Sequence, residues 1–530
     1  GVVWCLLFQA EDVIRDAQES RGLGEVYKRQ TKYLFDMINR GKVYFLSRPR
    51  RFGKSLTLST LKYLFLGEKE LFKHTWIENR WDWKAYPVVH ISLTETDTST
   101  PETLQESLLN LLEDTYKTFG LTLDSRLLKV AFRRLFSSVY EKTGERLVLL
   151  IDEYDKPILD HLHEPEIAQK NRDLLRTFCS TIKDADPYLR FVLMTGITKF
   201  TKAGVFSSLN NLYDISYTER YATMLGYTQE ELEKDFEEYI EEGLRQTGQS
   251  RAEYLEEMRR YYNGFSFDGK AFVYNPFSVL GYFRDFRYKN YWFESGSPYF
   301  LGEYIKRHEI EIDTLKETPI SETVFSAYEI EAAPPASFLA QSGYLTFKGY
   351  DPKRGYEVDF PNQEVKDVFS QLILLYGYGM ESQTNDRIRN GILDGLDTRD
   401  FEKIFEQMRR TLANIPYTLY RKREEEKGNE PERLERYYHV ILLTLFWGCG
   451  IEVKAEATHL GRSDLVITYG EDRYILELKK APPEKGLEQI REKGYGDKYP
   501  GKNLYYVGIE IDPEQRNLKG YRIEPATPDI

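Results

Sequence analysis

The chain has 530 residues, of which 41% are hydrophobic, and a formal net charge of -12. This length predicts roughly three or four domains, and the composition is sufficient to fill several hydrophobic cores. The acidic balance argues against a broadly basic surface that coats DNA, although a local basic groove is compatible with it. No segment of the sequence approaches the roughly 18 apolar residues of a membrane span, so we expect no membrane partner.

The first thirty residues resemble translated sequencing-adapter sequence at the end of a metagenomic gene. We therefore set residues 1–30 aside as a non-native segment and expect a truncated native start. Acidic residues follow the apolar stretch 1–8 and no basic region precedes it, which argues against a signal peptide. Only Cys179 and Cys449 lie outside this segment, and they form no C-x-x-C pair. This cysteine usage predicts neither a disulfide framework nor a zinc site, and it fits a reducing cytoplasm.

The first informative element is a strand followed by a phosphate-binding loop. An apolar run over 43–46 precedes the string Ser47-Arg-Pro-Arg-Arg-Phe-Gly-Lys-Ser55, and a helix is predicted over 56–65. In the standard loop G-x-x-x-x-G-K-[ST], backbone N–H groups surround the phosphates, the lysine contacts the outer phosphates and the hydroxyl binds Mg²⁺. The string supplies the last three parts, whereas Arg48 stands where the first glycine belongs. Alone, this incomplete motif also fits a solvated basic turn.

Strands and helices then alternate as in a parallel α/β sheet. A strand is predicted over 88–93, helices over 101–118 and 125–143, and an acidic strand over 146–153. This last strand consists of apolar residues followed by two carboxylates, as expected where a buried parallel strand ends at a ligand crevice. We expect Asp152 to hold Mg²⁺ through water and Glu153 to polarise the attacking water. Alone, this motif also fits a core strand with an acidic turn, but the two motifs together favour nucleotide binding.

A third strand, over 190–196, ends near a hydroxyl that could sense the γ-phosphate, although an ordinary strand end is the alternative. Thr198 and Lys199 follow directly. The three arginines of the loop form the sharpest basic cluster of the chain, and we expect them to face nucleotide rather than DNA. The predicted nucleotide-binding residues are Arg48, Arg50, Arg51, Phe52, Gly53, Lys54, Ser55, Asp152 and Thr195, with Ser55 and Asp152 also holding Mg²⁺.

The middle of the chain is predicted to be mainly helical. Residues 207–216 would complete an ATPase core at 31–220, and Thr228 with Glu231 predicts a helix cap within a helical lid domain at 221–345. In the lid, the strings Y-N-G-F and Y-N-P-F predict turns with packed aromatics rather than nucleotide contacts. Residues 346–428 are predicted to be a helical connector. Mixed charges with Gly and Pro over 421–433 predict an exposed boundary before a last domain at 429–530.

The last domain contains a predicted hairpin with acidic residues on both strands, 461–467 and 473–479. Because side chains alternate along a strand, Glu477 and Lys479 share a face, and Asp464 can lie beside Glu477 across the pair. These carboxylates suit Mg²⁺ or Mn²⁺, and the lysine could orient or activate a water that attacks a phosphodiester. Gln489, from the following helix, could support the site. A solvated hairpin is the alternative, but the flanking G-R-S-D string and the helix favour a nuclease.

Together these motifs resemble a bacterial family that joins an AAA-ATPase-like domain to a C-terminal PD-(D/E)XK nuclease-like domain. The resemblance covers roughly residues 31–510 and rests on the strings S-R-P-R-R-F-G-K-S, L-I-D-E-Y-D-K-P-I, M-T-G-I-T-K-F, Y-Y-N-G-F-S-F, V-Y-N-P-F-S-V-L, Q-S-G-Y-L and G-R-S-D…E-L-K…Q-I. It implies an α/β fold: a P-loop NTPase parallel sheet with a helical lid, followed by an α/β restriction-endonuclease-like domain. It also implies a nuclease site at Asp464, Glu477 and Lys479. A further acid often comes from the first helix of the nuclease fold, where Glu435 is the nearest match and Glu456 a rival.

The predicted function is an ATP-binding and ATP-hydrolysing protein that controls a metal-dependent nuclease. The expected cofactors are ATP and Mg²⁺, with Mn²⁺ an alternative at the nuclease site, and the expected substrate is DNA or RNA. The alternative is an ATP-dependent regulatory or interaction protein whose nuclease-like domain binds nucleic acid or a partner without cleaving it. A helicase-like motor is disfavoured because the sequence contains no second ATPase core. An oligomer would allow an arginine finger in trans, for which Arg220 is one of many candidates.

Overall fold

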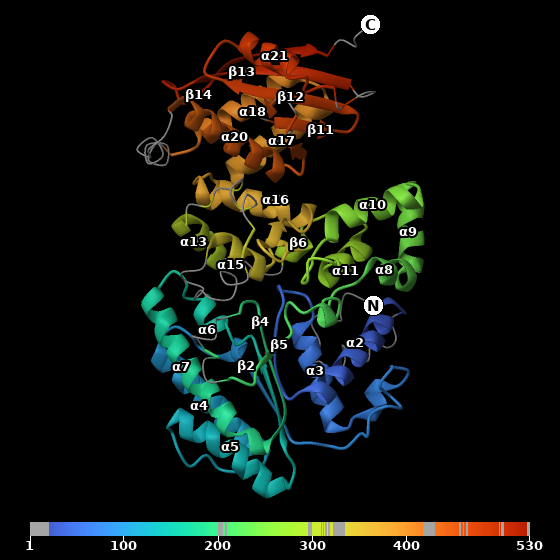
Figure 1. Ribbon diagram of the computed structural model, residues 1–530, viewed down its shortest axis with the longest axis vertical. Coiled ribbons are helices and arrows are strands. Elements are labelled where there is room, and N and C mark those ends of the chain that lie inside the picture. Colours follow the sequence, from blue (N-terminus) through green and yellow to red (C-terminus); the bar gives the residue numbers. More distant parts are fainter. Residues whose placement is uncertain are drawn as a thin grey trace. The chain divides into compact units, whose positions relative to one another are not determined.

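The computed structural model describes residues 21–199, 205–206, 209–294, 299–308, 310, 312, 315, 319–321, 334–416, 430–454, 457–458, 461–462, 465–497, 499 and 503–526 (Figure 1). The chain divides into two compact units. The first comprises Gly1–Phe300 with Lys316–Val365, and the second comprises Leu301–Leu315 with Lys366–Ile530. Each helix within the described part of the chain is too short or too polar to cross a bilayer.

A five-stranded parallel sheet in the order β2-β3-β4-β1-β5 forms the core of the first unit. Its strands are β1 (Val43–Ser47), β2 (Val88–Ser92), β3 (Leu147–Asp152), β4 (Leu189–Gly196) and β5 (Tyr213–Asp214). Every residue of β1 and β3 is buried, as expected of parallel strands that are covered on both faces. Because β4 lies between β1 and β3, the loops after these three strands meet at one edge of the sheet.

Helices cover both faces of this sheet. Figure 1 shows α2 and α3 on one side and α4, α5 and α7 on the other. The helices are α2 (Arg21–Arg40), α3 (Lys54–Leu66), α4 (Pro101–Thr118), α5 (Leu128–Thr143), α6 (Lys156–Leu159) and α7 (Pro165–Asp184). Helix α3 packs on β2, β3 and β4. Helix α2 begins inside the segment that the sequence analysis set aside, and Arg29 pairs with Glu231 at 2.8 Å.

The remainder of this unit, residues 219–294 and 334–365, is rich in buried tyrosine, and we call it the aromatic module. Its hydrophobic core includes Tyr227, Tyr254, Tyr262, Tyr274, Tyr282 and Tyr291. Its helices are α8 (Gln229–Asp235), α9 (Glu237–Thr247), α10 (Arg251–Tyr262), α11 (Pro276–Asp285), α12 (Tyr291–Glu294) and α15 (Pro335–Ser342). The predicted cap is confirmed, because the Thr228 hydroxyl accepts from the backbone N–H of Glu231 at 3.2 Å. In the Y-N-P-F turn, Asn275 caps α11.

The start of the predicted helical connector is instead an antiparallel pair, β6 (Thr346–Asp351) and β7 (Gly355–Asp359). Threonine and aromatic residues in β6 favour a pleated strand, and the rings of Phe347 and Tyr356 stack across the pair with centroids 4.2 Å apart. Gly355, at φ +101°, begins β7 where a side chain would strike the backbone of Ile320. The prediction of a helical connector is therefore wrong for residues 346–359.

The second unit contains a five-stranded mixed sheet in the order β14-β13-β12-β11-β8. The β12–β13 pair is parallel, and the other pairs are antiparallel. The strands are β8 (Glu452–Lys454), β11 (Leu465–Tyr469), β12 (Asp472–Lys479), β13 (Asn503–Asp512) and β14 (Asn517–Pro525), with a separate short pair β9 (Ala457–Thr458) and β10 (Gly461–Arg462). The predicted hairpin is confirmed for β11 and β12, which pair up to Leu465 and Leu476.

Helices pack on both faces of this mixed sheet. Figure 1 shows α21 on one face and α17, α18 and α20 on the other. The helices of the second unit are α17 (Ser382–Asp397), α18 (Phe401–Ala413), α20 (Glu430–Gly448) and α21 (Pro483–Glu492). Two further helices begin in the last residues of the first unit and continue into the second: α13 (Tyr299–His308) and α16 (Gln363–Leu372), which a π-helical turn at Ile373–Gly377 extends. Helix α21 connects the parallel strands β12 and β13 and packs on both. This crossover brings side chains of α21 next to the end of β12.

Candidate functional site

The phosphate loop ends at the first turn of α3. Gly53 precedes this helix at φ +88° and Arg51 has φ +65°, so the loop backbone turns through two left-handed positions. Lys54 opens the helix, and its ammonium donates hydrogen bonds to the carbonyls of Arg48, at 2.9 Å, and Pro49, at 3.1 Å. The loop therefore curls around its own lysine. Ser55 follows on the exposed side of the helix start, where its hydroxyl is accessible.

The acidic turn after β3 carries two carboxylates, Asp152 and Glu153, whose negative charges act on the Lys54 ammonium. Asp152 is 5% exposed, and its Oδ1 accepts from the Thr195 hydroxyl at 2.6 Å and from the backbone N–H of Glu153 at 3.0 Å. Burial lowers the pKa of Lys54, while Asp152 and Glu153 act in the opposite direction. Burial raises the pKa of Glu153, which Lys54 opposes. Glu153 also has φ +48°, a strained conformation for a residue that is not glycine.

A second buried carboxylate, Asp155, fixes the turn after β4. Its Oδ2 accepts from the backbone N–H groups of Ile197, at 2.8 Å, and Thr198, at 2.7 Å, and from the Thr198 hydroxyl at 2.8 Å. Burial raises the pKa of Asp155, and the donors from Thr198 lower it. Gly196 begins this turn, where a Cβ atom would meet the ring of Tyr154 at 2.6 Å. Asp155 thus holds the residues that follow Thr195.

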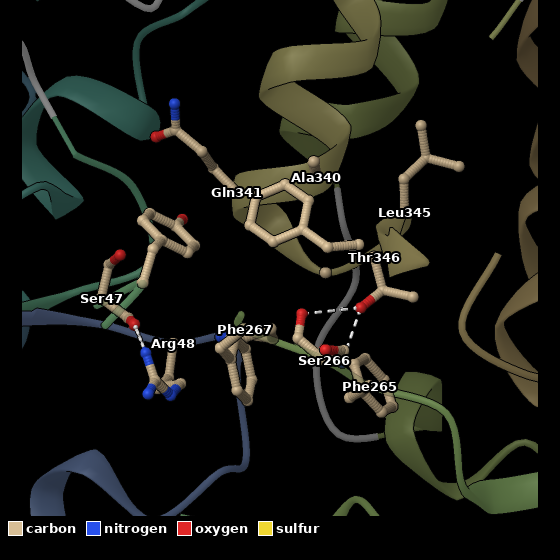
Figure 2. A pocket seen from close by; sticks show the side chains of 13 residues that line it. Ser47, Arg48, Phe265, Ser266, Phe267, Ala340, Gln341, Leu345 and Thr346 are labelled. Carbon is tan, nitrogen blue, oxygen red and sulfur yellow. Dashed lines mark hydrogen bonds between the residues drawn. The ribbon is translucent and has the colours of Figure 1, made fainter. Parts of the chain in front are cut away.

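The sequence predicted that Arg48 contacts the nucleotide, but its side chain lies in the protein core. It is 1% exposed, and its guanidinium donates to the carbonyls of Ser47, at 2.9 Å, Ser216 and Tyr221, at 2.9 Å. Its Cζ lies 3.9 Å from the ring centroid of Phe267, an attractive cation–π geometry. Figure 2 shows Arg48 beside Phe267 at the wall of a small pocket. Burial lowers the pKa of Arg48 to about 10, so the guanidinium remains charged at neutral pH.

The next residues of the loop also contact the aromatic module. Phe52 is 1% exposed, and its ring lies 4.9 Å from that of Phe265 and 5.5 Å from that of Phe267, centroid to centroid. Arg51 is exposed and lies over the ring of Phe277, with its Cζ 5.0 Å from the centroid. Arg50 is partly buried, and its carbonyl accepts from Trp292. The Phe52 side chain therefore packs in the interior, whereas Arg51 lies on the surface.

The other residues named near this site have partners within the unit. The Lys199 ammonium pairs with Asp214 at 2.5 Å, and its backbone N–H donates to Gln341 Oε1 at 2.8 Å. Gln341 lies in α15 and lines the same pocket as Arg48 (Figure 2). Arg220 is half exposed and lies 3.4 Å from Asp36.

The candidate nuclease residues come from two helices and a strand. Glu477, in β12, is 1% exposed, and its Oε1 accepts from Gln489 of α21. The Lys479 ammonium lies 3.3 Å from Glu477 Oε1 and 3.5 Å from Glu435 Oε2 of α20. Glu435 also accepts from the backbone N–H of Lys480 at 3.3 Å. These four side chains meet at the end of β12, while Asp464 and Glu456 lie outside the described residues.

The buried Asp155 was not predicted from the sequence, and the buried Arg48 was predicted to face nucleotide. Asp155 lies three residues after Asp152, and a carboxylate in the string L-I-D-E-Y-D is the signal that could have identified it. The partners of Arg48 at Ser216, Tyr221 and Phe267 are distant in sequence, so the local string contains no sign of them. Both side chains are buried and bind backbone groups near the site. Arg48 binds the carbonyls of Ser216 and Tyr221, and Asp155 binds the N–H groups of Ile197 and Thr198.

The two charge arrangements support different chemistry. Around Lys54 and Asp152, a cation and a carboxylate adjoin a loop of left-handed backbone, which suits a nucleotide phosphate with its Mg²⁺. Around Lys479, an ammonium lies between a buried and a partly buried carboxylate. This donor set suits a hard divalent cation beside a positive group that can contact a phosphate oxygen or water.

Comparisons with known proteins match both regions. A family model described as a predicted AAA-ATPase matches residues 14–206, and a model of the PD-(D/E)XK nuclease superfamily matches residues 433–521. An uncharacterized protein in the vnfD 5′ region of Azotobacter chroococcum mcd 1 is 34% identical over 510 residues, which cover 94% of this chain and 95% of that protein. The solved structure of the Aeropyrum pernix ORC2 protein, in ADPNP–ADP complexes, is 12% identical over 64% of this chain and 89% of that one, with a TM-score of only 0.25.

Proposed function

The chain belongs to the family that joins a predicted AAA-ATPase domain to a C-terminal PD-(D/E)XK nuclease superfamily domain, and from this premise we propose that it is an ATP-controlled, metal-dependent nuclease. The convergence of Glu435, Glu477, Lys479 and Gln489 from α20, β12 and α21 carries the proposal. In a hairpin with only a structural role, burying a glutamate against an amide and an ammonium would add little to the free energy of unfolding. Desolvating such charges is unfavourable, which favours a catalytic reason for the set.

The donor set fits a divalent cation. Glu477 would hold Mg²⁺ or Mn²⁺ with Glu435, and with Asp464 as the sequence predicts; when bound, the cation would stabilise charge on a phosphodiester. Gln489 holds the Glu477 carboxylate in one orientation from α21. Lys479 is fixed between two acids and would orient a water or a phosphate oxygen of DNA or RNA. Its two ion pairs would hold the ammonium in place beside the scissile phosphate.

The nucleotide site would bind ATP and hydrolyse it. Lys54 would exchange its two backbone carbonyl partners for the outer phosphates, and Ser55 and Asp152 would hold Mg²⁺. Glu153 would polarise the attacking water. Thr195 would orient Asp152 and respond to the γ-phosphate, since its hydroxyl bonds directly to that carboxylate. ATP at this site would then license cleavage in the second unit.

Cleavage assays with the full chain test this proposal. Linear, circular and single-stranded DNA and RNA are incubated with Mg²⁺ or Mn²⁺, with and without ATP, alongside Glu477→Ala and Lys54→Ala. We expect metal-dependent cutting that Glu477→Ala abolishes, and an ATP effect that Lys54→Ala abolishes.

Two matched substitutions control for nonspecific damage. Glu488→Ala removes an exposed carboxylate from α21, and Lys62→Ala removes a lysine from α3. Both are expected to behave like the parent protein. Persistent absence of cutting on every substrate, in a protein that binds ATP, would favour a regulatory binder of nucleic acid or of a partner.

A further inference from the structure

Trp292 connects the phosphate loop with a buried carboxylate. Its indole Nε1 donates to the carbonyl of Arg50 at 3.0 Å, and its backbone N–H donates to Glu364 Oε1 at 2.8 Å. The side chain is 6% exposed, and its ring contacts Phe265 and Tyr344, with centroids 6.1 and 5.1 Å away. Two directional hydrogen bonds and close packing therefore fix this tryptophan against the loop.

Glu364 is the other end of this connection. It is fully buried and is the second residue of α16, where the helix dipole favours a negative charge. Its second oxygen accepts from the Ser278 hydroxyl at 2.8 Å. Ser278 lies in the first turn of α11, in the string V-Y-N-P-F-S-V-L, which belongs to neither the nucleotide site nor the nuclease site. Burial of a carboxylate is costly, and these donors compensate for it.

Helix α16 has a particular place in the chain. The first compact unit ends at Val365 and the second resumes at Lys366, so the chain passes from one unit to the other inside this helix. The candidate nuclease residues follow it in sequence. A change at the first turn of α16 therefore acts on one of the covalent connections between the two units, the one that leads into the nuclease-like domain.

We infer that Trp292 and Glu364 are positioning residues that tie the phosphate loop to the start of α16, so that ATP binding is transmitted to this helix. The inference rests on the proposed ATP site and names how that site is regulated. Arg50 lies directly before the left-handed turn at Arg51, so its carbonyl reorients when the loop adjusts around phosphates. The Trp292 indole, which donates to that carbonyl, would move with it. The backbone N–H of Trp292 would pass this movement on to Glu364.

Hydrogen exchange of the full chain tests this inference. Exchange of the backbone amides of residues 363–372 is compared with and without ATP and Mg²⁺, alongside ATP affinity. In the parent protein we expect ATP to change exchange in this segment by at least about threefold. Trp292→Phe keeps an aromatic ring but removes the indole donor. We expect it to retain ATP affinity within about threefold while the response in 363–372 is lost.

Trp83→Phe is the matched control, because it removes a comparable bond, from the indole of Trp83 to the carbonyl of Glu78 at 2.8 Å, elsewhere in the same unit. Its response is expected to equal that of the parent. Glu364→Gln, which removes the charge and keeps the size, provides a second variant in case Trp292→Phe does not fold. In this variant too, we expect ATP binding to leave the hydrogen exchange of residues 363–372 unchanged.

The outcomes separate the inference from the proposed function. A parent protein that binds ATP without any change in 363–372, or a folded Trp292→Phe that responds like the parent, would overturn the inference and leave the ATP site intact. Failure of the parent to bind ATP would overturn the proposed function itself. If cleavage responds to ATP, the ratio of rates with and without ATP should fall towards one in Trp292→Phe while cleavage without ATP is unchanged.

Discussion

The Thr195 hydroxyl donates a 2.6 Å hydrogen bond to Asp152 Oδ1 across neighbouring strands β4 and β3. The backbone N–H of Glu153 donates to the same oxygen at 3.0 Å. One carboxylate oxygen is thus fixed by two donors, which restricts rotation of the whole group. The orientation of the proposed Mg²⁺ ligand therefore depends on the strand that separates it from the phosphate loop.

Thr195→Val keeps the shape of the side chain and removes this donor. We expect kcat for ATP hydrolysis to fall about tenfold with KM nearly unchanged, because a misoriented carboxylate affects the reaction more than binding. The loss of a buried hydrogen bond should also lower the free energy of unfolding by about 1–3 kcal/mol. Steady-state kinetics and urea denaturation measure the two effects. Thr195→Ser, which retains a hydroxyl, should recover most of both, and an unchanged kcat in Thr195→Val would remove Thr195 from the mechanism.

The proposed role of Glu153 predicts a pH dependence. Burial raises the pKa of this carboxyl above its ordinary value of 4.5, against the attraction of Lys54. Since the ionised form would polarise water, hydrolysis should decline with falling pH at a midpoint above 4.5. Glu153→Gln should bind ATP and reduce hydrolysis by about a hundredfold or more. The profile of kcat against pH, with ATP affinity measured in parallel, checks both; a midpoint at or below 4.5 would contradict the assigned role.

Arg48→Gly introduces the residue of the standard phosphate loop, yet we expect it to destabilise the protein. The substitution leaves the buried carbonyls of Ser216 and Tyr221 without the guanidinium and removes its contact with Phe267. Losses of this kind lower the free energy of unfolding by about 2–5 kcal/mol. Thermal and urea unfolding of the full chain measure the change. Arg48→Lys retains a charge but not the fork of donors and should recover only part of the stability.

At the candidate nuclease site, the ammonium of Lys479 lies between Glu435 and Glu477. Lys479→Met removes the charge and keeps much of the length, so we expect cleavage to fall by about a hundredfold or more. Lys485→Met is the matched control, because this lysine is exposed and pairs only with Glu488 among the described residues. Initial cleavage rates at saturating metal compare the variants. Equal losses in both would indicate general damage, and full activity in Lys479→Met would refute the role of this lysine.

The buried thiols allow each unit to be observed by itself. Cys179 lies in α7 of the first unit and Cys449 follows α20 in the second, and burial raises the pKa of each to about 12. In a Cys5→Ser background, both thiols should react with a disulfide reagent at about pH 8 at least a thousandfold more slowly than an exposed cysteine. Mass spectrometry during urea titration should show each thiol become reactive when its own unit unfolds. Rapid reaction without denaturant would contradict this burial.

Much of the architecture was predictable because the residues of the proposed nucleotide site lie at or just after the carboxyl ends of strands. Apolar runs that end in Ser47, Asp152 and Gly196 identified three neighbouring strands, and their parallel arrangement brings these ends to one edge. The alternation along β12 placed Glu477 and Lys479 on one face, and they do lie 3.3 Å apart. Local periodicity was sufficient in these cases, since the relevant neighbours lie in the same strand or helix.

Long-range packing was not predictable in the same way. A motif fixes where the backbone of Arg48 lies, but its rotamer is chosen by carbonyls and a ring that lie far along the chain. The β6–β7 pair was missed because the whole region was predicted to be a helical connector. The strand character of residues 346–359 depends on cross-strand partners such as Phe347 with Val358 and Tyr350 with Tyr356. Asp155 looked like one acid among several until its three donors from the turn after β4 were evident.

Arg48 also bears on how relatives of this protein can be found. The loop needs left-handed backbone at Arg51 and Gly53, and Arg48 is not among the residues with positive φ. Glycine is therefore not a conformational requirement at position 48, and the requirement that replaces it is a set of acceptors for a buried guanidinium. A search pattern that insists on the first glycine would discard this loop. One that pairs a basic residue at position 48 with an aromatic residue at position 267 would retain it.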